Sequence, residues 1–261
     1  MKKVIVLLFI LVLVYQLFIK ENIALDTEIS LEQQSIHRGD LVLINKETML
    51  HEDPTNLMAI PQRIASNVHM NAEYLLQEQV IPPLQEMFEA AAKDGVSHFT
   101  INSAYRNQAL QQQLYEKNGA DYALPSGYSE HQSGLSLDIG SSQGTMDEVI
   151  EGEWLENNAA KYGFILRYPE NKQDITGIAF EPWHFRYVGL PHSMMIAKKG
   201  FAFEEYLNYI KEKKEYKMEM NGVTYFVQYV QQTSFAKIPE TQSFKVSGDN
   251  KSGFIITSVI Q

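Results

Sequence analysis

The sequence predicts an α+β fold in which a small antiparallel sheet is flanked by helices. Apolar residues recur at helical spacing in several segments, and short runs with β-type alternation, such as residues 136–139, lie between them. At 261 residues, the chain is long enough for about one to two domains. We expect one main domain, an N-terminal membrane anchor and a small C-terminal β-rich extension.

The N-terminus differs from the rest of the chain. Two lysines precede a run of 16 mostly apolar residues, 4–19, and no small-residue cleavage site follows directly. Positive charge before the run favours a cytoplasmic N-terminus. We therefore predict an uncleaved signal anchor over residues 1–20, with the main domain outside the cytoplasm. A cleaved signal peptide is the alternative, and it also exports the domain. The polar residues 21–39 are predicted to form a linker.

Residues 40–207 are predicted to form the main domain. In chain order, the patterns predict a strand, two helical pieces separated by a proline pair, a strand, a helix, a strand, a helix and two strands. Proline interrupts a helix because it lacks the backbone donor, which is why two pieces are expected. The segments are 41–45, 62–94 with Pro82 and Pro83, 98–104, 107–117, 136–139, 145–162, 164–167 and 183–187.

The last part of the chain has a different pattern. Residues 204–217 predict a charged helix, and residues 224–230 and 254–259 are rich in β-forming residues. A Gly-Asp-Asn turn signal at 248–250 lies between the two β-type runs. We expect residues 208–261 to form a small appended β unit.

Composition excludes several classes of function. Acidic residues outnumber basic ones, 32 to 22, which gives a formal net charge of −10 and argues against a nucleic-acid partner. Cysteine is absent, so the chain has no disulfides, no thiolate metal ligands and no cysteine nucleophile. Any metal ion must be held by histidine, aspartate or glutamate.

Two histidines lie in settings typical of a metal site. His131 and Asp138 are seven positions apart, from a turn-rich segment into a predicted strand, and His184 lies in another predicted strand. Two imidazoles and one carboxylate leave a fourth tetrahedral position open, as in catalytic zinc sites. Glu181 lies three positions before His184, where its carboxylate is suited to act as a general base. The alternatives are structural histidines and a surface salt bridge.

These motifs resemble a known family. The pattern Ser-x-His-x-x-Gly-x-x-x-Asp over residues 129–138, followed by Glu-x-Trp-His over 181–184, is similar to the signature of VanY- and VanX-type zinc D,D-peptidases. The Tyr-Arg pair at 105–106 and the stretch 162–189 look closest to VanY-type D,D-carboxypeptidases. The resemblance covers roughly residues 40–207, and every ligand and base position of the pattern is present. Ser136 stands where the family often has alanine.

The resemblance implies a role for each matching residue. It makes His131, Asp138 and His184 the ligands of one Zn²⁺ and Glu181 the catalytic base. It makes Arg106 the group that stabilises charge on the scissile carbonyl oxygen, as a guanidinium is suited to do. Ser129, Gln111 and Tyr105 are expected near the substrate. The alternative roles are a structural ion pair for Arg106, a turn cap for Ser129 and a solvated helix position for Gln111.

We therefore expect a membrane-anchored, monomeric zinc D,D-carboxypeptidase that removes D-alanine from peptidoglycan stem peptides ending in D-Ala-D-Ala. Three alternatives stay open: an L,D-carboxypeptidase that trims tetrapeptide stems, a D,D-dipeptidase, and a non-catalytic cell-wall binding module that contains zinc. An anchored enzyme meets long stems, which makes the dipeptidase the weakest of the three. Some relatives contribute to glycopeptide resistance, and the sequence leaves that role open.

Overall fold

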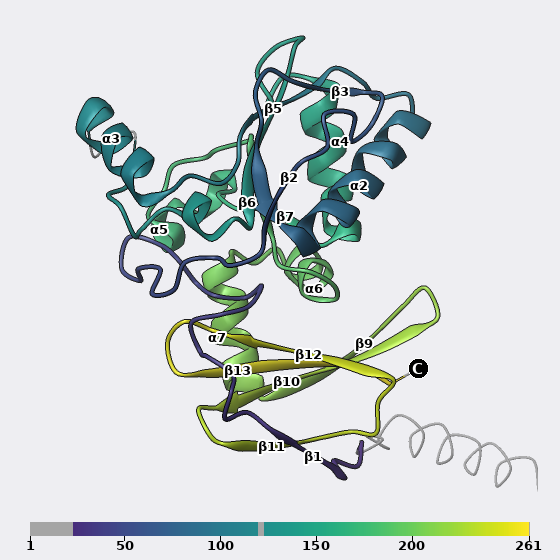
Figure 1. Cartoon of the computed structure of the whole chain (residues 1–261). Coiled ribbons are helices and arrows are strands. Elements are labelled where there is room, and N and C mark those ends of the chain that lie inside the picture. The colour runs from purple at the N-terminus through teal and green to yellow at the C-terminus, as the bar shows by residue number, and fades with distance from the viewer. Residues whose placement is uncertain (1–22, 120–122, 261) are drawn as a thin grey trace, which may run out of the picture.

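The computed structural model describes residues 23–119 and 123–260. Figure 1 shows two parts, with the C-terminal strands below a larger part that is built on a five-stranded sheet. Helix α7 (Phe203–Lys213) lies between them. The predicted mixture of helices and small sheets is confirmed.

The five-stranded sheet forms the centre of the larger part. In order across the sheet, its strands are β3 (Val68–Met70), β5 (Phe99–Ser103), β6 (Ser136–Ser141), β8 (His184–Tyr187) and β7 (Phe164–Leu166). All neighbours are antiparallel except β3 and β5, which are parallel. The prediction of an antiparallel sheet therefore holds for four of these five strands.

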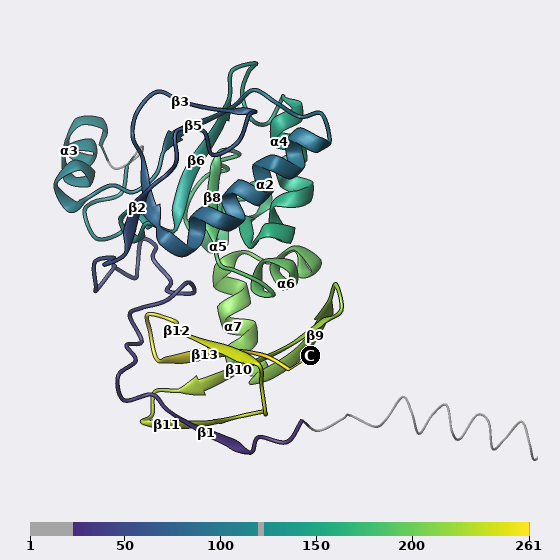
Figure 2. The same ribbon diagram turned by 45° about the vertical axis from the view of Figure 1, so that its right-hand side comes forward.

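One face of this sheet is covered by helices α2 (Ile81–Lys93) and α4 (Ile150–Asn158), as Figure 2 shows. Successive side chains of a strand point to opposite faces. In β6, Leu137 and Ile139 are fully buried in the core that also contains Phe88 of α2. Asp138 points to the opposite face of the sheet. The helices therefore cover one face, and the polar side chains lie on the other.

The prediction of two helical pieces over 62–94 is wrong for the first piece. That stretch contains β3 and β4 (Leu75–Gln77), and β4 pairs with β2 (Leu57–Ala59). Its apolar residues are buried by strands that pair with distant segments, which overrides the local periodicity. The proline pair lies in the first turn of α2, where a missing backbone donor is tolerated.

The strand predicted at 41–45 is also wrong. Leu41, Val42, Leu43 and Ile44 are buried, but the described structure has only an isolated bridge between Asn45 and Thr48 there. Side chains satisfy the backbone instead of a neighbouring strand. Arg186 Nη2 donates to the carbonyl oxygens of Asp40 and Val42, and Asn250 Nδ2 donates to that of Leu43.

The remaining elements of the main part follow the predicted order. Helix α3 (Gln108–Asn118) is capped by Asn107, whose Oδ1 accepts from the backbone N–H of Leu110. Helix α4 starts five residues later than predicted, and the helical segment ends at Gly163 as expected. Short helices connect the strands, namely η1 (Glu78–Val80), η2 (Glu130–Ser133), η3 (Ala159–Tyr162), η4 (Glu170–Lys172), α5 (Gln173–Thr176) and α6 (His192–Lys199).

The C-terminal part is β-rich, as expected, but contains more strands than the patterns predict. A four-stranded sheet has the order β12-β13-β10-β9, and β11 pairs with β1. The helix expected over 204–217 ends early, because its last residues begin β9. The strands are β9 (Glu215–Met220), β10 (Val223–Gln231), β11 (Phe235–Ile238), β12 (Ser243–Gly248), β13 (Gly253–Val259) and β1 (Thr27–Ser30).

The structure bears on the predicted linker but not on the predicted anchor. Strand β1 belongs to the segment predicted as a linker, and Leu31 beside it is buried against Ile238. The expected anchor over 1–20 lies outside the described residues. Among residues 23–119 and 123–260, no helix is both long and apolar enough to span a bilayer.

Candidate metal centre

Three side chains from two neighbouring strands and the turn before them converge on one point. Asp138 of β6 is the direct cross-strand partner of His184 of β8, and His131 comes from η2, just before β6. Asp138 Oδ1 lies 3.2 Å from His184 Nδ1 and 3.4 Å from His131 Nε2. One potential ligand atom from each residue lies within 4.8 Å of the others.

The donor set fits a zinc ion. Ligands at about 2.1 Å from a tetrahedral Zn²⁺ are about 3.4 Å apart, which matches the spacing of these atoms. Asp138 Oδ1 is buried and has no hydrogen-bond partner among the described residues, an arrangement that a cation would satisfy. Burial raises the pKa of Asp138, but His131 and His184 lower it well below its usual range, so the carboxylate is charged.

A backbone hydrogen bond fixes the ring orientation of His131. Its Nδ1 lies 2.7 Å from the carbonyl oxygen of Ala104, which can only accept. Nδ1 therefore carries the proton, and Nε2 presents a lone pair toward Asp138. Burial lowers the pKa of His131, which favours the neutral imidazole that binds metals.

Glu181 lies beside this cluster because of a tight turn. The backbone N–H of His184 donates to the carbonyl oxygen of Glu181, which brings both side chains to the same side. Glu181 Oε2 lies 3.7 Å from His184 Nδ1, and the side chain is 29% exposed. Burial raises the pKa of Glu181, as suits a carboxylate that exchanges protons. This carboxylate stays open to a bound molecule.

Arg106 contacts the second carboxylate oxygen of Asp138, the one that does not face the histidines. Its Nη2 is 3.2 Å from Asp138 Oδ2, and its Nε donates to Ser103 Oγ. Gln111, expected near the substrate, is 1% exposed. Its Oε1 accepts from Arg106 Nη1, and its Nε2 donates to the carbonyl oxygen of Leu124. Gln111 is therefore not a solvated residue, and in this structure its amide supports Arg106.

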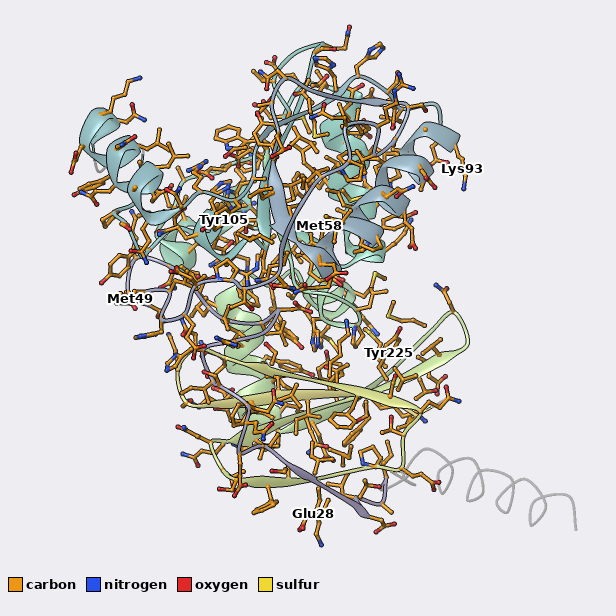
Figure 3. The ribbon with its side chains drawn as sticks, viewed as in Figure 1. Glu28, Met49, Met58, Lys93, Tyr105 and Tyr225 are labelled. Atoms are coloured by element: carbon orange, nitrogen blue, oxygen red, sulfur yellow. The ribbon has the colours of Figure 1, made fainter. Side chains whose placement is uncertain are left out.

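The other two expected substrate residues lie near the same face. Ser129 precedes η2, and its hydroxyl has no hydrogen-bond partner within the described part of the chain; its side chain does not cap η2. Tyr105 is half-buried, and Figure 3 places it between α3 and the central strands. Burial and the charge of Asp53 raise the pKa of Tyr105, so its hydroxyl is protonated.

A buried ion cluster lies next to His184, and the sequence patterns did not predict it. Glu130, Arg167 and Arg186 are each 0–1% exposed, and both arginines pair with the carboxylate of Glu130. Arg186 lies within a short apolar strand, Arg167 directly follows another, and Glu130 is next to the candidate ligand His131. Charges at these positions were the available signal, because charges are almost never buried without a partner.

Two imidazoles and a carboxylate around one point, with a further carboxylate free beside them, define a mononuclear zinc hydrolase. The family model of VanY, D-alanyl-D-alanine carboxypeptidase, matches residues 73–190. A D-alanyl-D-alanine carboxypeptidase of Enterococcus faecium is 43% identical over 237 residues, which cover 88% of this chain and 78% of that protein. The chain belongs to the VanY family of D-alanyl-D-alanine carboxypeptidases.

Solved structures agree with this assignment. The vancomycin-resistance D,D-dipeptidase VanXYg, in complex with a D-Ala-D-Ala phosphinate analogue, has a TM-score of 0.78 and 32% identity, covering 89% of this chain and 98% of that one. The LD-carboxypeptidase LdcB has a TM-score of 0.59 and 33% identity, covering 67% and 88%. A glutamate-to-alanine variant of VanY from a VanB-type cassette, in complex with Zn(II), has a TM-score of 0.55 and 33% identity, covering 65% and 99%.

Proposed function

We propose that the chain is a zinc D,D-carboxypeptidase that hydrolyses the terminal D-Ala-D-Ala amide of peptidoglycan stem peptides and releases D-alanine. The observation that carries this function is the convergence of Glu181 and Arg106 on the cluster of His131, Asp138 and His184. Membership in the VanY family supports the same substrate class.

His131 Nε2, Asp138 Oδ1 and His184 Nδ1 would hold the ion. When bound, Zn²⁺ supplies Lewis acidity that polarises the scissile carbonyl and makes water more acidic. Glu181 accepts a proton from the attacking water as its oxygen adds to the carbonyl carbon. The same carboxyl group then donates this proton to the leaving nitrogen as the C–N bond breaks, so D-alanine departs as a neutral amine.

Arg106 stabilises the negative charge that develops on the carbonyl oxygen. Its guanidinium stays protonated although burial lowers its pKa, because Asp138 and Glu181 favour the charged form. Ser103 and Gln111 hold the group in place, so little reorganisation is needed as charge develops. The hydroxyl of Ser129, which has no hydrogen-bond partner among the described residues, is suited to bind the terminal carboxylate of the stem, and Tyr105 is suited to contact the peptide.

The test is product analysis. The full-length chain is incubated with muramyl pentapeptide, muramyl tetrapeptide and free D-Ala-D-Ala, and products are followed by mass with and without a chelator. Loss of one D-alanine from the pentapeptide, blocked by the chelator, is the expected result. A zinc-loaded protein that cleaves none of the three substrates would contradict the catalytic assignment and favour a binding module.

Two other specificities are outcomes of the same assay. One observation favours the dipeptidase activity. The structure of VanXYg, which matches 89% of this chain, is named a D,D-dipeptidase. Cleavage of free dipeptide together with pentapeptide would make the enzyme bifunctional. Cleavage of tetrapeptide alone would move the assignment to the L,D specificity of LdcB.

The cellular setting is part of the proposal. The apolar run at residues 4–19 supports a single-pass membrane protein with its catalytic domain outside the cell, acting as a monomer on the wall. A role in glycopeptide resistance is consistent with the resistance proteins among the structural neighbours. Cell fractionation combined with protease accessibility in intact cells tests the location.

A further inference from the structure

A fully buried carboxylate lies directly behind the metal ligand His184. The side chain of Glu130 has no solvent exposure, and its Oε1 accepts from Arg167 Nε at 2.8 Å and from Arg186 Nη1 at 2.9 Å. Two buried guanidinium groups that donate to one carboxylate oxygen favour the charged form of that carboxylate. Glu130 is therefore an anion held in a fixed orientation.

The second oxygen of Glu130 is turned toward His184. Oε2 accepts from Ser136 Oγ at 3.0 Å and lies 3.5 Å from His184 Nε2. His184 Nε2 is buried and has no hydrogen bond among the described residues, so this carboxylate oxygen is available to it within a small rotation of the ring. The ring of His184 also packs against the ring of Tyr168, with the two centroids 4.9 Å apart.

The chemistry of the site requires a partner at that nitrogen. Nδ1 of His184 faces Asp138 and Glu181, so Nδ1 is the atom that meets the metal and must carry no proton. In the neutral imidazole the proton then lies on Nε2. A buried N–H without an acceptor is unfavourable, whereas a carboxylate acceptor fixes the tautomer and makes the imidazole a stronger ligand.

We propose that Glu130 is a positioning residue that accepts the Nε2 proton of His184 and so sets the tautomer and ring orientation needed to bind zinc. It does not touch the substrate. The two ligand histidines are thus supported in different ways: His131 by the backbone carbonyl of Ala104, and His184 by a charged side chain.

The variant Glu130→Gln keeps the size of the side chain but changes its hydrogen-bonding groups, so it tests the acceptor role separately from packing. The two arginines donate to one oxygen of residue 130, so the glutamine carbonyl is expected to face them. Its NH₂ group then points at His184 Nε2, which sets donor against donor. Glu204 offers a matched control: it pairs bidentately with the same Arg167, at 2.9 and 2.6 Å, and has no contact with His184 in the described structure.

The experiment measures zinc affinity of the full-length chain by competition with a chromophoric chelator. Glu130→Gln is expected to lower the affinity about 10–100-fold and to change the visible spectrum of the Co²⁺-substituted protein. Glu204→Gln is expected to leave both unchanged. Equal affinities of Glu130→Gln and the wild type, or an equal loss in Glu204→Gln, would overturn the proposal.

A second variant covers the case in which Glu130→Gln fails to fold. Glu130→Asp keeps the negative charge between the arginines but withdraws the carboxylate by about 1.5 Å, one C–C bond. It is expected to lose zinc affinity with its fold retained, and wild-type affinity would contradict the role.

The inference rests on the zinc site of the proposed function, and the assay uses no peptide. Wild-type protein that binds no zinc would refute that site, whereas unchanged variants would refute only the role of Glu130.

Discussion

Asp138 and His184 are direct cross-strand partners on the antiparallel strands β6 and β8, with Oδ1 of the first 3.2 Å from Nδ1 of the second. The register of the central sheet therefore sets the distance between two of the three proposed ligands. A shift of one residue would turn Asp138 into the helix-covered core. The metal centre depends on the pairing of these strands more than on any loop.

Replacing Glu181 by glutamine removes the proton acceptor without removing a proposed metal ligand. We expect D-alanine release to fall about 10²–10⁴-fold with zinc content unchanged, since general acid–base groups contribute on that scale. Zinc content and turnover are measured on the same sample. The same substitution at the exposed Glu170 is the control. Full activity in Glu181→Gln would remove this residue from the mechanism.

Arg106→Lys keeps the charge but loses the planar group that spans Asp138 and Gln111. We expect kcat and kcat/KM to fall together, by about 10²-fold, because the lost interaction is strongest in the transition state. Steady-state kinetics on the pentapeptide measures both constants. A change confined to KM would show that Arg106 binds the ground state only.

Gly134 has a φ of +69° between His131 and β6, and a Cβ there would lie 2.8 Å from Leu57 Cδ2. Gly134→Ala is expected to destabilise the fold by about 1–2 kcal/mol from the left-handed backbone alone, and further through the contact with Leu57. Gly95 is the matched control, since its φ is +80° but a Cβ there meets nothing within 4 Å. Denaturant unfolding of both variants gives the difference. A loss in Gly134→Ala no larger than in Gly95→Ala would contradict a steric role of Leu57.

His192 links the two parts of the molecule in its neutral form. Its Nδ1 lies 2.5 Å from Tyr206 Oη and its Nε2 lies 2.9 Å from Thr257 Oγ1. Burial lowers its pKa from 6.5 to about 3, and Lys245 contributes in the same direction. Between these two values the unfolded chain binds the proton and the folded protein does not, so stability falls as pH decreases from 6.5 toward 3.

From this shift we expect about 2 kcal/mol less stability at pH 5 than at neutral pH. Denaturant unfolding at both pH values measures it. The variant His192→Gln lacks this titration, so its stability should depend less on pH over the same interval. An identical pH dependence in the variant would show that His192 does not carry the effect.

The metal centre was more predictable than the fold around it. His131, Asp138, His184 and Glu181 belong to short motifs with fixed spacing, so their types and order identify the centre without knowledge of the sheet. The first half of 62–94 was mistaken for a helix because its three-residue strands are stabilised by pairing with β2 and β5, which local periodicity does not record.

Roles that depend on tertiary contacts were missed for the same reason. The contact of Gln111 with Arg106 follows from how α3 packs, and the pairing of Glu130 with Arg167 and Arg186 joins three separate segments. In the C-terminal part, strand β12 carries mostly polar or exposed residues, and strand β11 has only four residues, too few for a pattern that identifies a strand.

The most direct test of the zinc assignment is a titration of the metal-depleted full-length chain with Zn²⁺, with D-alanine release from muramyl pentapeptide as the readout. The described residues contain a single cluster of suitable ligands, His131, Asp138 and His184. We predict that activity rises linearly to one equivalent of zinc and then stays constant. Release of D-alanine by the metal-depleted protein, or no release after one equivalent has bound, would contradict the account.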